Sequence, residues 1–344
     1  MSTVLQQPFS NTLPDPSVEA RARKIVESVR SGNRTALGRA ITLIESNASK
    51  HAPLAEEVIR QALQHTGKAI RVGITGVPGA GKSTFIEALG CLLCGQGKRV
   101  AVLAVDPSST LSRGSVLGDK TRMEMLCREA NCFIRPSPSS GTLGGVTRKS
   151  RETMLLCEAA GYDVILVETV GVGQSETAVR SMVDFFLVLL IAGAGDELQG
   201  IKKGIIELAD TLLITKADGS NLPRTEAARA EFSGVLHYLT PATPGWKPEV
   251  LTCSSLENRG IAEAWEAVEH FRTAMMQSGF FQENRRRQTI DWMEDMLSQA
   301  LWDDFTHNPG IIAHWQDIES DVLQGHLSAT TAVKQLFNAY THHD

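Results

Sequence analysis

The sequence lacks several features that would mark other classes of protein. No apolar run approaches the roughly 20 residues needed to cross a bilayer, so no membrane span is expected. The first 20 residues contain no Lys or Arg, and neither a secretory nor a mitochondrial presequence is evident. The formal net charge of −5 gives no reason to expect a nucleic-acid partner. These absences favour a cytoplasmic protein.

Cysteine is also scarce, with six in 344 residues, as expected of a protein whose thiols stay reduced. Cys91 and Cys94 form a Cys-x-x-Cys pair, but they lie on the apolar course of a predicted helix. No second pair and no histidine cluster accompany them, so we expect core packing rather than metal or redox use. The run of like charge at 285–287, three arginines, is expected to be a solvated helix face.

Hydrophobic periodicity divides the chain into three parts. Residues 1–68 contain stretches at helical spacing and predict an N-terminal helical extension. Residues 69–275 alternate short apolar runs with helical patterns, which predicts an α/β domain with a mostly parallel sheet flanked by helices. Residues 276–344 are helical again and predict a C-terminal arm, with an apolar stripe at Ile290, Met293, Leu297 and Leu301. The predicted strands are 71–75, 100–105, 132–135, 164–167, 185–191, 211–215 and 249–252.

The strongest chemical signal is the segment GVPGAGKST at 76–84, which matches the P-loop pattern completely. A strand pattern precedes it and a helix pattern follows. Glycines let successive N–H groups face phosphate oxygens, and the helix start adds its positive dipole end. Lys82 is expected to reach the β- and γ-phosphates, and the Ser83 hydroxyl to bind magnesium. The predicted nucleotide-binding residues of this loop are Gly76, Pro78, Gly79, Ala80, Gly81, Lys82, Ser83 and Thr84.

A second motif indicates which base is bound. The segment LLITKADG at 212–219 resembles the guanine-reading pattern Asn-Lys-x-Asp, with Asp218 as the acid that accepts from the ring N–H and exocyclic amine of guanine. Adenine lacks that donor pair, so a buried acid discriminates against it. The Lys216 stem would pack along the base. The first position departs from the pattern, because Thr215 stands there instead of Asn. The loop TCSSLENRG at 252–260 fits a segment that closes over the guanine carbonyl oxygen, through Ser254, Ser255 and Leu256.

At these motifs the chain resembles the metallocentre-assembly family of P-loop GTPases. Its magnesium-side motif, Glu-Thr-x-Gly, is matched at 168–171, with Glu168 where many nucleotide hydrolases have Asp. Within that family the chain resembles the MeaB/ArgK branch, which are GTPase chaperones of adenosylcobalamin-dependent acyl-CoA mutases. Four strings carry this resemblance, which covers residues 20 to 300. They are VDPSSTLSRGSVLGDKTRM (105–123), ETVGVGQSE (168–176), GAGDELQGIKKGIIELAD (193–210) and LTCSSLENRGI (251–261).

The resemblance implies roles for individual residues. The implied magnesium ligands are Ser83, Asp106, Asp119 and Glu168, the last reaching the metal through one of the waters that magnesium keeps. Gly171 would donate its N–H to the γ-phosphate. Gln174 would orient a water, although a polar loop residue is the plain alternative. Lys202 belongs to an additional switch loop at 196–203, where a solvated Lys is the alternative. The implied catalytic residues are Lys82, Glu168, Gln174 and Lys202.

The implied activity is Mg²⁺-dependent hydrolysis of GTP to GDP by a protein that docks on methylmalonyl-CoA mutase or a relative. It would gate the loading of adenosylcobalamin from an adenosyltransferase, protect the mutase, and form a homodimer through the C-terminal arm. For the apolar stripe of that arm, a core within one chain is an equally good interpretation. The chain has no cobalamin-binding Asp-x-His-x-x-Gly motif, so the cofactor is expected in the partner. Two other functions stay open at this point. One is a P-loop kinase or ATPase linked to amino-acid transport, and the other is a nickel metallochaperone, although the nine histidines are scattered.

Overall fold

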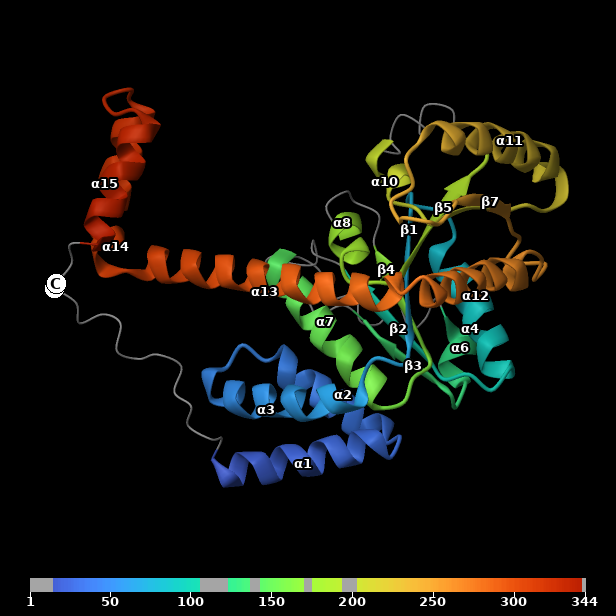
Figure 1. Cartoon of the computed structure of the whole chain (residues 1–344), viewed down its shortest axis with the longest axis horizontal. Helices are drawn as coiled ribbons and strands as arrows, with labels where there is room; N and C mark the ends of the chain where they lie inside the picture. Colours follow the sequence, from blue (N-terminus) through green and yellow to red (C-terminus); the bar gives the residue numbers. More distant parts are fainter. Residues whose placement is uncertain (1–14, 106–122, 137–142, 170–174, 194–202, 342–344) are drawn as a thin grey trace. The chain divides into compact units, whose positions relative to one another are not determined.

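The computed structural model describes residues 15–105, 123–136, 143–169, 175–193 and 203–341. Of these described residues, those up to Arg285 form one compact unit and those from Arg286 onward form another (Figure 1). None of the described helices is long and apolar enough to span a bilayer. All six cysteines are free thiols, and Cys94 is buried while Cys91 is partly buried on helix α4 (Lys82–Gly95).

A seven-stranded sheet in the order β3-β2-β4-β1-β5-β6-β7 forms the centre of the first unit. Every neighbouring pair is parallel. The strands are β1 (Ile70–Gly76), β2 (Val100–Val105), β3 (Cys132–Arg135), β4 (Val164–Thr169), β5 (Phe185–Ile191), β6 (Thr211–Thr215) and β7 (Glu249–Thr252). All seven predicted strands are confirmed, and β1 and β4 each extend beyond the predicted bounds. Their apolar runs are nearly continuous because helices cover both faces of the sheet.

Alternate strand residues build two separate cores, as the two-residue period of a strand requires. On β2, Val100 and Val102 join the core under α4, α6 (Glu124–Arg128) and α12 (Ile261–Gln277). Ala101 and Leu103 face the other core. That core lies under α7 (Leu143–Ala159), α8 (Ser175–Arg180), α10 (Lys203–Glu207) and α11 (Leu222–Tyr238). One short 3₁₀ turn, η4 (Gly219–Asn221), precedes α11.

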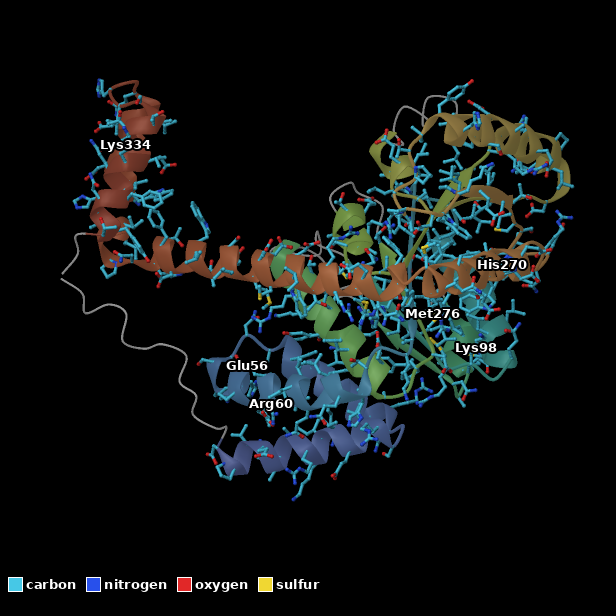
Figure 2. The ribbon with its side chains drawn as sticks, viewed as in Figure 1. Glu56, Arg60, Lys98, His270, Met276 and Lys334 are labelled. Atoms are coloured by element: carbon cyan, nitrogen blue, oxygen red, sulfur yellow. The ribbon has the colours of Figure 1, made fainter. Side chains whose placement is uncertain are left out.

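The N-terminal helices belong to the same unit as the sheet. They are α1 (Pro16–Arg30), α2 (Arg34–Glu45) and α3 (Ala52–Ala62), with the 3₁₀ turns η1 (Ser49–His51) and η2 (Leu63–His65). All three pack beside α7 (Figure 1), and their buried apolar side chains continue the α7-side core. Asp15 and Asn33 cap α1 and α2 by accepting from backbone N–H groups. On α3, Arg60 (labelled in Figure 2) donates two hydrogen bonds to the carboxylate of the buried Glu57.

The described part of the second unit consists of helices joined by short connections. Helix α13 (Phe280–His307) contains the boundary between the units, and α14 (Pro309–Leu323) and α15 (Ala329–Thr341) follow it. The Phe305 ring contacts the rings of Phe337 and Tyr340, and the Tyr340 hydroxyl donates to Asp304 at 2.6 Å. The predicted apolar stripe lies on α13, and its members are 51% to 60% exposed: Ile290, Met293, Leu297 and Leu301.

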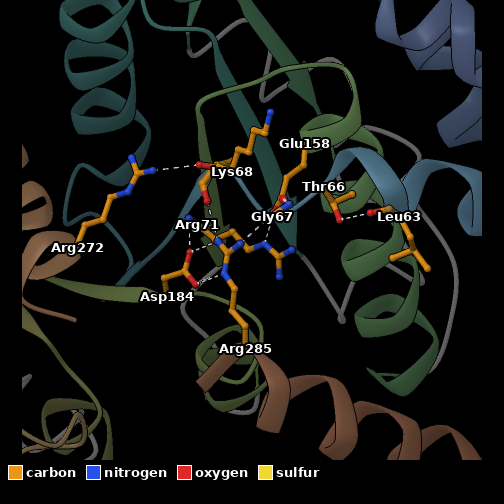
Figure 3. Close-up of polar contacts among 10 residues, drawn as sticks. Leu63, Thr66, Gly67, Lys68, Arg71, Glu158, Asp184, Arg272 and Arg285 are labelled. Carbon is orange, nitrogen blue, oxygen red and sulfur yellow. Dashed lines mark hydrogen bonds and ion pairs between the residues drawn. The ribbon is translucent and has the colours of Figure 1, made fainter. Parts of the chain in front are cut away.

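The prediction that 285–287 is a solvated face is wrong for Arg285 (Figure 3). Its side chain is only 15% exposed. Its Nε and Nη2 atoms donate to the two Asp184 oxygens at 2.7 and 2.6 Å. Asp184 also accepts from the Arg71 N–H at 2.8 Å, and Arg71 Nε donates to Glu158 at 2.6 Å. The buried acids Asp184 and Glu158 hold Arg285 inside, whereas Arg286 and Arg287 are exposed.

Candidate functional site

The phosphate loop connects the end of β1 to the start of α4. Gly76 has φ of 150°, and a Cβ there would lie 2.3 Å from the Leu189 carbonyl oxygen, so only glycine fits. Gly81 has φ of 80° and precedes the first residue of α4, where its left-handed backbone also favours glycine. This chain reversal leaves backbone N–H groups and a helix start at one place, which is the geometry that binds phosphate. Ala80 and Lys82 are buried, whereas Pro78, Gly79 and Thr84 are exposed.

The Lys82 ammonium group folds back over this loop. Its Nζ donates to the carbonyl oxygens of Gly76 at 2.8 Å and Val77 at 3.3 Å. Burial lowers the pKa of Lys82, and the nearby carboxylates of Glu168 and Glu176 oppose that shift. Glu176 lies on α8 and is buried. Sequence reasoning assigned it no role, because nothing in a sequence distinguishes a buried acid in the first turn of a helix from a solvated one.

Two of the predicted magnesium ligands, Ser83 and Glu168, lie in contact. Ser83 Oγ donates to Glu168 Oε1 at 3.0 Å. Glu168 lies near the end of β4, opposite Ile74 of β1, and the neighbouring Thr169 hydroxyl donates to Thr75 at 2.7 Å. The 3.0 Å contact fits a site in which Ser83 would bind magnesium and Glu168 would reach the ion through one of the waters that magnesium keeps. Among the described residues no group of three or more His, Cys, Asp or Glu could hold a metal ion by itself.

The residues predicted to contact the guanine base lie in the loops that follow β6 and β7, which we call the base side. Lys216 has φ of 58°, and its carbonyl accepts from the Asn221 amide at 2.8 Å. A non-glycine residue in the left-handed region is uncommon, and such strain gathers at functional sites. Lys216 is exposed and Asp218 is partly buried. The Ala217 N–H donates to the Cys253 carbonyl at 2.9 Å, which joins this loop to the one after β7.

Ser254 holds the side chain expected to read the base. Its hydroxyl donates to Asp218 Oδ2 at 2.6 Å and accepts from the Glu257 N–H at 3.2 Å. Ser255 is partly buried and Leu256 is 82% exposed. Burial raises the pKa of the neighbouring Cys253 thiol to about 12, with the Asp218 charge adding to the shift. The role of Ser254, Ser255 and Leu256 at a guanine carbonyl stays a prediction.

One contact joins the base side to the phosphate side. Thr215, the last residue of β6, is 3% exposed, and its Oγ1 lies 2.8 Å from the Ala80 carbonyl oxygen and 3.0 Å from that of Leu190. The sequence marks Thr215 as a departure from the guanine motif but does not reveal this link. Five predicted residues lie outside the described parts of the chain: Asp106, Asp119, Gly171, Gln174 and Lys202.

The phosphate loop and the base-side loops follow the carboxyl ends of parallel strands, and Glu168 lies at the carboxyl end of β4. This edge is where ligands bind in open α/β sheets. The chain reverses its direction of winding at β1, which lies between β4 and β5. This fold and this loop define a P-loop nucleoside triphosphatase.

Comparison with known proteins gives the family. The family model described as methylmalonyl Co-A mutase-associated GTPase MeaB matches residues 37–310. The chain is 47% identical over 318 residues to GTPase ArgK of Escherichia coli, covering 92% of this chain and 96% of that protein. It is 46% identical to the mitochondrial methylmalonic aciduria type A homolog of Mus musculus, covering 90% of this chain and 77% of that protein. A crystal structure of an LAO/AO transport system kinase superposes with a TM-score of 0.76 at 40% identity, covering 95% of this chain and 99% of that one.

The chain belongs to the MeaB family of GTPases, and its activity is GTP hydrolysis. The predicted family and the predicted P-loop fold are confirmed.

Proposed function

We propose that this GTPase is a chaperone of an adenosylcobalamin-dependent acyl-CoA mutase, methylmalonyl-CoA mutase or a relative. The nucleotide state would gate the transfer of adenosylcobalamin from an adenosyltransferase to the mutase and protect the loaded mutase. The observation that supports the partner is the family match over 37–310, since the family is described as mutase-associated. The mouse relative is named for methylmalonic aciduria, which agrees with that partner.

The geometry of the site supports the nucleotide part of the proposal. Asp218 supplies a carboxylate, held by Ser254 at 2.6 Å, on the same sheet edge as the phosphate loop. Lys82 would exchange its two loop carbonyls for the β- and γ-phosphates, which are stronger partners for a buried ammonium group. Ser83 and Glu168 would hold magnesium, completed by Asp106 and Asp119. A bound magnesium ion neutralises charge on the phosphates.

The partner is tested by co-purification with candidate mutases in the presence of GDP, of a non-hydrolysable GTP analogue, and of no nucleotide. We expect a stable complex whose affinity depends on the nucleotide, because a ligand shifts an equilibrium only by its differential affinity. Equal capture in all three states, or none, would contradict a nucleotide-gated chaperone. The name of the transport system kinase suggests a second function to test, that of a kinase. Transfer of labelled γ-phosphate to a protein, instead of release as phosphate, would favour a kinase.

Coupling to the mutase is proposed to run through the loop at 196–203. The catalytic role implied for Lys202 is taken to act only in the reaction stimulated by the mutase. We therefore expect Lys202→Ala to leave basal GTP hydrolysis within about threefold, roughly 0.7 kcal/mol of barrier, and to remove most of the acceleration by the mutase. Turnover is measured with and without saturating mutase. Lys247→Ala, a change in the loop before β7, is the matched control and should keep the acceleration. Full stimulation of the Lys202 variant would place the coupling elsewhere.

We also propose that the C-terminal arm joins two copies of the chain. The α13 stripe exposes four large apolar side chains, and such a patch on a helix marks an interaction surface. Leu297→Glu together with Leu301→Glu would place charge in that surface and should convert a dimer into a monomer in sedimentation equilibrium. The exposed Asp303→Lys is the matched control, and a monomeric unaltered protein would refute the proposal.

A further inference from the structure

The hydroxyl is the only hydrogen-bond donor of the Thr215 side chain, and it already donates to backbone carbonyl oxygens. A threonine hydroxyl carries one proton and two acceptor lone pairs. Within the described part of the chain, both hydrogen-bond partners of Oγ1 are backbone carbonyl oxygens, of Ala80 at 2.8 Å and of Leu190 at 3.0 Å. Since carbonyl oxygens only accept, the single proton is shared between them. The side chain is 3% exposed, so water cannot replace either contact.

These two contacts decide what Thr215 can offer to a bound base. An asparagine at this position has two amide protons and could give one to a carbonyl and the other to a base. On the Hoogsteen edge of guanine, N7 is an acceptor and needs a donor. The Thr215 proton is held by two carbonyls, and its lone pairs cannot bond to another acceptor. Thr215 therefore has no free donor for a hydrogen bond to N7.

The same contacts give the hydroxyl a different task. Ala80 is a buried member of the phosphate loop, and Leu190 belongs to β5, the strand beside β6. Asp218, which would read the base, follows Thr215 by three residues. One hydroxyl thus ties the start of the base-side loop to the backbone of the phosphate loop.

We infer that Thr215 is a positioning residue for the phosphate loop, and that it leaves N7 of guanine unread. The inference rests on the proposed binding of guanine nucleotides. It requires that loss of the Thr215 hydroxyl lowers the affinity for the nucleotide phosphates without changing the selectivity for guanine over other bases. Thr215→Val, which keeps the side-chain shape, leaves the Ala80 carbonyl without this donor and should weaken GDP binding about three- to tenfold.

Calorimetry with four nucleotides tests this inference on the unaltered chain. We expect 7-deaza-GDP, which has C–H in place of N7, to bind within about twofold of GDP. IDP lacks the exocyclic amine that Asp218 would accept from and should bind about tenfold more weakly or worse. ADP should be weaker still. Equal binding of ADP and GDP would refute the proposed guanine site itself. Guanine selectivity with a tenfold loss for 7-deaza-GDP would overturn only the present inference.

Two variants of Thr215 separate positioning from base contact. In Thr215→Val the ratios of GDP to 7-deaza-GDP and of GDP to IDP should stay those of the unaltered chain, while all three affinities fall together. A fall for GDP that spares 7-deaza-GDP would show that the hydroxyl reads N7 and would overturn the inference. Thr215→Ser keeps the hydroxyl and should restore affinity to within about twofold. If the valine variant does not fold, the serine variant and the 7-deaza-GDP ratio still decide the question.

Discussion

Removal of the Asp184 carboxylate should strongly destabilise the first unit. Asp184 is 2% exposed and accepts three hydrogen bonds, from the Arg71 N–H at 2.8 Å and from two nitrogens of Arg285 at 2.7 and 2.6 Å. Asp184→Ala leaves a buried N–H unpaired and takes the close carboxylate from a largely buried guanidinium. Breaking a buried pair from one side costs about 3–5 kcal/mol. Glu158 Oε1 stays 3.9 Å from Arg285 Nη1, so we expect about 3 kcal/mol.

The free energy of unfolding is measured by urea titration, with hydrogen exchange of the β5 amides as the probe. That probe reports on the first unit alone, whereas tryptophans lie in both units. The control is Glu269→Ala. Glu269 pairs with Lys98 (labelled in Figure 2) at 2.8 Å, but the two side chains are 48% and 30% exposed, so the loss of Glu269 should cost about 0–1 kcal/mol. A loss for Asp184→Ala no larger than for this control would refute the reasoning, because burial would then not decide the strength of the pair.

Three further predictions follow from the site and the core. Asp218→Asn should lower GDP affinity by about 2 kcal/mol or more in calorimetry, as expected when a charged acceptor is lost, and unchanged affinity would remove Asp218 from the base site. Glu168→Gln should still bind GDP but hydrolyse GTP poorly in a phosphate-release assay, and turnover equal to the unaltered chain would remove Glu168 from the catalytic residues. Gly73→Ala would place a Cβ 2.8 Å from the Phe186 ring and should cost about 1–3 kcal/mol in urea unfolding, while Gly234→Ala, with open space at its Cβ, should not.

The sequence by itself determined the features that depend on neighbouring residues. The phosphate loop is nine consecutive residues whose glycines dictate the backbone, and the strands are apolar runs whose two-residue period selects a sheet covered on both faces. The family motifs were legible for the same reason, since each is one short string. Glu168 and Asp218 could therefore be chosen as site residues, because each ends or closely follows a predicted strand.

Only the tertiary structure decided which distant residues meet. Thr215 and Ala80 are 135 positions apart, and Ser254 reaches Asp218 across 36. Arg285 was predicted to be solvated because a run of three arginines is typical of a surface. It is largely buried because it donates to Asp184, which lies 101 positions earlier in the chain. A local pattern specifies backbone conformation and the burial of a face. The partner of a polar side chain is set by strand order and helix packing, because the cost of burying an unpaired polar group is settled only when the folded chain supplies its partner.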